Sequence, residues 1–153
     1  MDISYMNNNY TFNYRACAII TNNNRLLLEQ SNNNNYYSLV GGRVKFGQTS
    51  LDAVIREVEE EIGYKADISN CKLINISENF FDTKKCKFHE ILMIYKINIS
   101  NEEDLASKNN FSCLDKDSTK IFWVNKEDLN NMDIRPSSII KLIDSSILTH
   151  SIL

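Results

Sequence analysis

The part of the sequence that most constrains the fold is the passage from a glycine-containing loop into one strongly periodic helix, between Gly41 and Gly63. Thr49 or Ser50 can cap the start of this helix, and Gly63 stands where a C-terminal glycine cap is expected. Its apolar residues recur at helical spacing, at Leu51, Val54, Ile55, Val58 and Ile62. Such a helix must bury its apolar side, and a sheet is the surface that the neighbouring segments predict.

Strand-like segments lie on both sides of the predicted helix. Strands are expected at 14–20, 25–30, 36–40, 71–81, 87–99 and 120–124. A short helical turn is expected at 126–131, and a closing helix at 137–148, just after Pro136. Residues 1–12 are polar and predicted to be a loose lead-in, which leaves 13–153 as the domain. The pattern predicts one α/β domain in which helices pack on a mixed β-sheet.

The composition is that of a globular chain with no general attraction for polyanions. The 153 residues suffice for one domain, with 42% hydrophobic and 24% charged residues. A formal net charge of -3 gives no reason to expect binding to nucleic acid or an anionic membrane. The apolar runs fall far short of the ~20 residues that span a bilayer, and no secretory signal is visible. The 4 cysteines form no CxxC pair, which favours reduced thiols and a cytoplasmic location.

Carboxylates crowd the second half of the predicted helix. On a wheel of about 100° per residue, Glu57, Glu60 and Glu61 share one arc, whereas Glu59 falls on the other flank. These neighbours repel one another, and they lie toward the negative C-terminal end of the helix dipole. A divalent cation would remove both objections, since oxygen ligands at this spacing suit Mg²⁺ or Mn²⁺. A solvated acidic helix face is the alternative, and the glutamates taken alone would favour it.

The residues around these glutamates resemble the Nudix box of the Nudix hydrolases, written G-x5-E-x7-R-E-U-x-E-E-x-G-U, where U is a bulky apolar residue. Within Gly42–Tyr64 the pattern is matched by Gly42, Arg56, Glu57, Val58, Glu60, Glu61 and Gly63. One defining position departs, because Gln48 stands where the family has its first glutamate. Tyr64 replaces the final aliphatic residue, and the glycine pair follows Val40 where the family often has a proline.

The resemblance implies a Nudix-type α/β/α sandwich that hydrolyses, with Mg²⁺ or Mn²⁺, a nucleoside diphosphate linked to another moiety. It assigns the metal to Glu57, Glu60 and Glu61. Catalytic roles would fall to Glu57, Glu60, Gln48 and Arg56. The arginine would orient Glu60 or Gln48. Because Gln48 keeps an acceptor oxygen but loses the charge, slower turnover is expected rather than loss of all activity.

Substrate contacts are expected from the loop before the helix and from one residue outside it. At Gly41 and Gly42 the backbone can approach a phosphate closely, and Arg43 is a candidate phosphate or ribose contact. Members of the family often take a further carboxylate from outside the box. Glu90 is the first candidate for this role and Glu78 the second, although a charged residue on a sheet edge would explain either one equally well.

Two classes of function remain open from the sequence. The leading hypothesis is a MutT-like pyrophosphatase acting on a nucleoside triphosphate, ADP-ribose or a nucleotide sugar, and these residues do not separate the three. The alternative is a Nudix-fold sensor that binds a nucleotide without turnover, a hypothesis that Gln48 keeps open. The retention of all the helix carboxylates favours the enzyme. The expected partner is a small-molecule nucleotide; family members often form homodimers, but no stretch of this chain identifies an interface.

Overall fold

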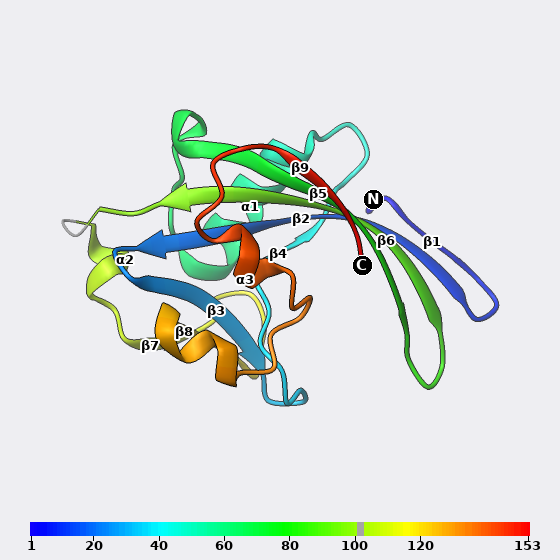
Figure 1. The fold of residues 1–153 in the computed structure, drawn as a ribbon. Coiled ribbons are helices and arrows are strands. Elements are labelled where there is room, and N and C mark those ends of the chain that lie inside the picture. The colour runs from blue at the N-terminus through cyan, green and yellow to red at the C-terminus, as the bar shows by residue number, and fades with distance from the viewer. Residues whose placement is uncertain (101–102) are drawn as a thin grey trace.

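The computed structural model describes residues 1–100 and 103–153, and its long strands project as hairpins from a body of sheet and helices (Figure 1). The strands are β1 (Ser4–Asn7), β2 (Tyr10–Asn22), β3 (Arg25–Ser31), β4 (Val40–Arg43), β5 (Cys71–Asp82), β6 (Lys87–Asn98), β7 (Asn110–Ser112), β8 (Thr119–Asn125) and β9 (Thr149–Ile152). The helices are α1 (Ser50–Ile62), α2 (Asp104–Ser107) and α3 (Ile139–Leu142), with 3-10 turns η1 (Ile68–Asn70) and η2 (Lys126–Asn131). None of the helices in the described residues is both long and apolar enough to cross a bilayer.

The strands form one mixed sheet of 9 strands. Its main path runs β7-β8-β3-β2-β6-β5-β9, and both β1 and β4 pair with β2 outside this path. The β2–β6 and β5–β9 pairs are parallel. The β2–β6 pairing extends from Tyr10 opposite Lys87 to Thr21 opposite Asn98, so these two strands form the spine of the fold. The prediction of one α/β domain with a mixed sheet is confirmed.

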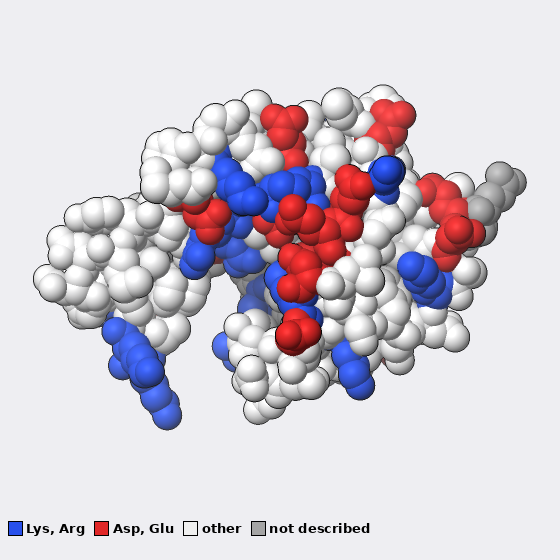
Figure 2. Space-filling view, turned by 180° about the vertical axis from the view of Figure 1, so that it is seen from behind, with Lys and Arg blue, Asp and Glu red and all other residues white. Residues whose placement is uncertain are grey.

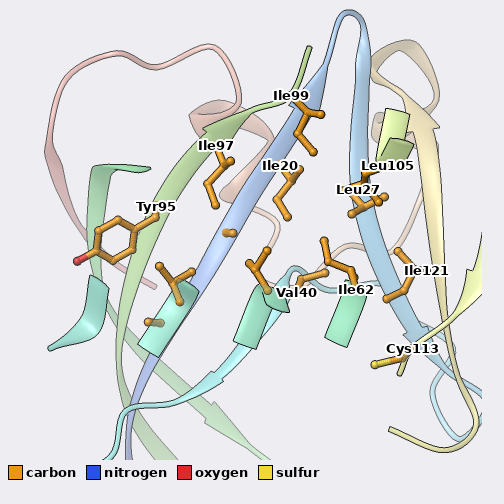
Figure 3. Close-up of a cluster of buried hydrophobic side chains, with 14 of the residues drawn as sticks. Ile20, Leu27, Val40, Ile62, Tyr95, Ile97, Ile99, Leu105, Cys113 and Ile121 are labelled. Carbon is orange, nitrogen blue, oxygen red and sulfur yellow. The ribbon is translucent and has the colours of Figure 1, made fainter. Parts of the chain in front are cut away.

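Apolar side chains cover both faces of the sheet, which gives the α/β/α layering expected from the resemblance. On one face, side chains of β2, β3 and β6 meet those of α1, and Figure 3 draws Ile20, Leu27, Ile97 and Ile62 in this cluster. The other face is covered by η2 and α3, whose buried residues pack on the alternate residues of the same strands. This second cluster includes Cys17, Ile19, Ile94, Leu129, Ile139 and Leu142.

The N-terminal segment differs from the prediction. Residues 1–12 were expected to be loose, yet Ser4–Asn7 is strand β1 and β2 already begins at Tyr10. The turn between them contains Asn8 at a φ of 53°, a conformation that asparagine tolerates better than most residues. Tyr5 lies opposite Phe12 across the pair, so apolar cross-strand contacts support a hairpin that polar composition alone concealed.

The C-terminal segment and one short strand also differ. The closing helix predicted at 137–148 is limited to Ile139–Leu142, and Thr149–Ile152 forms strand β9 instead. Buried Asn75 of β5 holds this strand, since its Nδ2 donates to Thr149 Oγ1 at 2.8 Å and to Ser151 Oγ at 2.9 Å. The strand predicted at 36–40 is wrong in extent, because regular pairing starts only at Val40.

Candidate functional site

The site lies where two neighbouring strands separate. Strand β2 pairs with β3 only beside their shared turn, and β3 then runs along β8. Strand β4 takes the vacated place next to β2, with Gly41 opposite Cys17 and Gly42 opposite Ala16. Helix α1 packs over β4 and β2, so its inner side faces the point where the strands part.

Local interactions fix both ends of α1. Thr49 is the N-cap, and its Oγ1 accepts from the Asp52 amide at 3.1 Å while Asp52 Oδ2 accepts from the Thr49 amide at 3.2 Å. This is a reciprocal capping box. Gly63 caps the C-terminus at a φ of 70°, and its amide donates to the Glu59 carbonyl. The helix therefore begins and ends at defined residues.

The buried side of α1 is rotated from the predicted one. Leu51 and Ile55 were expected to be buried, but both are partly exposed. Ala53, Glu57 and Glu61 are buried instead, with Glu61 at 0% exposure. The glycine of the underlying strand explains the rotation, because a Cβ at Gly42 would overlap the carboxylate of Glu57. Two carboxylates thus point inward at the glycine pair, rather than outward from the flank and back of the helix.

Arg56 binds two carboxylates of the helix, the inward-pointing Glu57 and the exposed Glu60. Its Nη1 lies 2.7 Å from Glu57 Oε1 and 2.7 Å from Glu60 Oε2. Its Nη2 donates to the Arg43 carbonyl at 3.1 Å and to Gln48 Oε1 at 3.5 Å. Arg56 therefore meets both partners named from the sequence, and Gln48 occupies the place beside the guanidinium with a neutral acceptor. Burial lowers the pKa of Arg56, but hydrogen bonds and the charges of Glu57 and Glu60 outweigh it and raise the pKa overall.

The inner carboxylate, Glu61, belongs to a second charge cluster. The Lys116 ammonium forms an ion pair with Glu61 Oε1, lies 3.3 Å from Glu29 Oε2 and donates to the Gly41 carbonyl at 3.5 Å. Glu61 Oε2 accepts from the Gly41 amide at 3.3 Å. Burial, followed by the negative charge of Glu29, raises the pKa of Glu61 to about 8. Burial would lower the pKa of Lys116, but the charges of Glu29 and Glu61 outweigh it and raise the pKa.

Glu90 reaches this region only through another side chain. It is 3% exposed, its Oε2 lies 3.7 Å from Arg15 Nη1, and its Oε1 accepts from Asn79 at 3.3 Å. Arg15 Nη2 in turn donates to the Gly41 carbonyl at 3.4 Å. The geometry thus gives Glu90 a link to the glycine pair but little surface for direct contact with a substrate.

Arg43 and Glu78 lie in different surroundings. The Arg43 side chain is 47% exposed beside the glycine pair, and its Nε donates to Asn13 Oδ1 at 3.2 Å. Its Nη1 lies 3.6 Å from Asp2 Oδ2, so a ligand at Arg43 would share or replace this exposed ion pair. Glu78 lies 3.0 Å from His150 Nε2 on the edge formed by β5 and β9, where its neighbours are not those of α1.

The sequence alone assigned no role to Glu29 or Lys116. The sequence does carry a signal for Glu29. This residue directly follows the leucine run of β3 and shares the buried face of Leu27, where a charge needs a partner. No spacing pointed to Lys116, which lies in the loop between β7 and β8. Figure 2 shows the face opposite to that of Figure 1. Acidic side chains gather in the middle of this face, and basic side chains lie among them and along a hollow beside the projecting hairpins.

The chemistry of these residues fits a divalent cation, although the described residues form no ready cage of three acidic, histidine or cysteine side chains. The available donors are the carboxylates of Glu57, Glu60 and Glu61 and the Gly41 carbonyl, all oxygen ligands of the kind that Mg²⁺ takes. The absence of a Cβ at Gly42 makes the space for Glu57. The carboxylates are turned toward Arg56 and Lys116, which explains why they do not converge on one point.

Comparison with known proteins identifies the fold and the family. The mutator MutT protein of Bacillus halodurans superposes with a TM-score of 0.70 at 21% identity, covering 91% of this chain and 88% of that one. A MutT Nudix hydrolase of Burkholderia pseudomallei gives a TM-score of 0.64 at 18% identity, covering 88% and 98%. A search of curated proteins gave no match. The profile of the NUDIX domain matches residues 11–143, most of the chain and all of the site, and the chain therefore belongs to the Nudix family, as its sequence predicted.

Proposed function

We propose that this protein is a Mg²⁺- or Mn²⁺-dependent pyrophosphohydrolase that cleaves a nucleoside diphosphate linked to another moiety. One observation carries the proposal: Glu57 and Glu61 are buried one helical turn apart against the glycine pair of β4. Two carboxylates held inside the protein are costly unless cations compensate them. Arg56 and Lys116 do so only in part, because each of these cations is shared with a second carboxylate. A solvated acidic helix face would leave these two residues in water, and so it does not account for their burial.

The chain's own groups have distinct tasks in this reaction. Glu57, Glu60 and Glu61 would hold the divalent ion, which when bound neutralises charge on the pyrophosphate and makes a water more acidic. Arg56 positions Glu57 and Glu60 through its two 2.7 Å contacts. The exposed Arg43 is suited to a phosphate oxygen, because its guanidinium offers paired donors beside the glycine pair. Glu90 acts at a distance, through Arg15 and the Gly41 carbonyl.

The second candidate function is a nucleotide sensor without turnover, and Gln48 is the observation that favours it. In this position a glutamate would pair with Arg56 by charge, whereas Gln48 Oε1 accepts at 3.5 Å. An Arg56 side chain held by this weaker contact would position Glu57 and Glu60 less well. The inward carboxylates nevertheless favour hydrolysis, since binding alone would not require them to be buried.

The test is the cleavage of a panel of nucleoside triphosphates, ADP-ribose and nucleotide sugars. It is read as phosphate or pyrophosphate released from the triphosphates, and as nucleoside monophosphate and sugar phosphate formed from the other two classes. Each substrate is assayed with Mg²⁺, with Mn²⁺ and with a chelator, and Glu61→Gln serves as the control for contaminating activity. We expect one class to be cleaved only when metal is present, and only by the unmodified chain. Tight metal-dependent nucleotide binding without cleavage would instead support the sensor. Cleavage in chelator would contradict both functions.

A further inference from the structure

The ammonium of Lys116 sits inside a cage of oxygen atoms. Its neighbours are carboxylate oxygens of Glu61 and Glu29 and the carbonyl oxygen of Gly41. Glu61 is 0% exposed and Glu29 is 8% exposed, so water screens this cage poorly. Lys116 comes from the loop between β7 and β8, while the oxygens come from α1, β3 and β4. One cation therefore joins elements that are distant in the sequence.

A second cation at this cage would compete with Lys116 for the same oxygen atoms. An ammonium at Glu61 Oε1 blocks the oxygen that an incoming ion would use, and two positive charges a few ångströms apart repel strongly where water is excluded. The Lys116 side chain can leave this position, since it is 35% exposed whereas its partner Glu61 is wholly buried. The lysine can therefore turn toward solvent without crossing the core, whereas Glu61 has no such freedom.

We propose that Lys116 is the resident counter-cation of the metal-free protein, and that a divalent ion binding at Glu61 displaces its ammonium into solvent. The inference rests on the proposed metal site. Lys116 partly compensates the Glu29 and Glu61 carboxylates before metal arrives, and it lowers the affinity of the site because it must be expelled. A lysine that merely ties the β7–β8 loop to α1 would stay in place when metal binds.

Chemical labelling of the unmodified protein tests the displacement directly. Lysine amines are acetylated in chelator and in saturating Mn²⁺, and the rate at each lysine is read by mass spectrometry, with Mn²⁺ binding measured in parallel by electron paramagnetic resonance. Lys65 is the internal control, because it pairs with Glu59 of the same helix but is 84% exposed. We expect Mn²⁺ to speed labelling of Lys116 severalfold and to leave Lys65 unchanged. Bound Mn²⁺ with unchanged or slower labelling of Lys116 would overturn the proposal.

A matched pair of variants tests the competition. Lys116→Gln and Lys65→Gln remove the same charge beside a glutamate of α1, one inside the cage and one at the surface. Couplings between sites commonly change affinity by about 5- to 150-fold, so Lys116→Gln should bind Mn²⁺ at least about fivefold more tightly than the unmodified chain. Lys65→Gln should not. Equal or weaker Mn²⁺ binding by a folded Lys116→Gln variant would overturn the proposal.

These measurements separate this inference from the proposed function. Mn²⁺ binding that exposes Lys116, without cleavage of any nucleotide, would support the displacement and contradict the hydrolase. Metal-dependent cleavage with Lys116 still protected would do the reverse. If the protein binds no Mn²⁺, the metal site is wrong and both proposals fall.

Discussion

Replacing Gly42 by alanine tests how closely helix α1 packs against strand β4. A Cβ at this position would overlap the carboxylate carbon and both oxygens of Glu57. Glu57 is 8% exposed and is held by Arg56 at 2.7 Å, so its carboxylate has little room to retreat. Overpacking of this kind costs about 1–3 kcal/mol of stability. More importantly, the Glu57 carboxylate would have to move away from its position against Gly42.

The matched control is Gly47→Ala in the loop between β4 and α1. Nothing lies within 4 Å of a Cβ at Gly47, but its φ of 78° strains any residue with a side chain. That strain costs about 1–2 kcal/mol, similar to the overpacking at Gly42. The two variants should therefore lose comparable stability in urea unfolding, while only one of them moves Glu57.

The readouts are kcat/KM on the substrate found in the nucleotide panel and the free energy of unfolding. A displacement of about 1 Å in a positioned group costs on the order of 100-fold in rate, so Gly42→Ala should lose about that much and Gly47→Ala should stay near the unmodified chain. If both variants turned over substrate equally well, Glu57 would not owe its function to its place against Gly42. The reasoning about the rotated helix would then be refuted.

Three further outcomes are expected. Glu60→Gln or Glu61→Gln should lower turnover by about 100-fold or more while circular dichroism shows an intact fold; full activity in either would remove the metal assignment. Gln48→Glu should keep or raise activity, because a charged acceptor would strengthen the 3.5 Å contact with Arg56, and a large fall would reveal another role for Gln48. In chelator, the free energy of unfolding should fall as pH rises from about 4.5 toward 8, since folded Glu61, with its pKa raised to about 8, keeps a proton that the unfolded chain loses. Urea titrations at several pH values should find this slope flattened in Glu61→Gln, and an unchanged slope would contradict the assignment.

Periodicity predicted much of this structure because the elements that it detects are those whose burial alternates regularly. The long strands β5 and β6, the strand β8 and the 3-10 turn at 126–131 follow from their apolar spacing or turn composition, and the capped ends of α1 follow from Thr49 and Gly63. These features depend on neighbours in the sequence. The hairpin at the N-terminus and strand β9 depend instead on distant partners, such as Asn75, that local composition does not reveal.

The same distinction divides the site. The Arg56 cluster is local, because one helical turn and the preceding loop contain all its members, and sequence spacing predicted it. The rotation of α1 was missed because a wheel centred on leucine and isoleucine ignores the surface underneath. Only the β2–β4 pairing places Gly42 beneath Glu57 and makes room for a carboxylate there. Lys116 and Glu29 meet Glu61 only after β3 has separated from β2, which no spacing along the chain encodes.

The charge balance of the assembled site offers a reason why position 48 holds a neutral glutamine in place of a glutamate. When fully ionised, Glu57 and Glu60 share the single cation Arg56, and Glu61 and Glu29 share Lys116. Four carboxylates thus face two cations, a deficit of two charges. Departure of Lys116 would raise the deficit to three, so one divalent ion in its place would leave a single negative charge among these groups. A glutamate at position 48 would add a further negative charge beside Arg56, where the structure has a neutral amide. The glutamine therefore keeps the uncompensated charge around one bound divalent ion to a single unit.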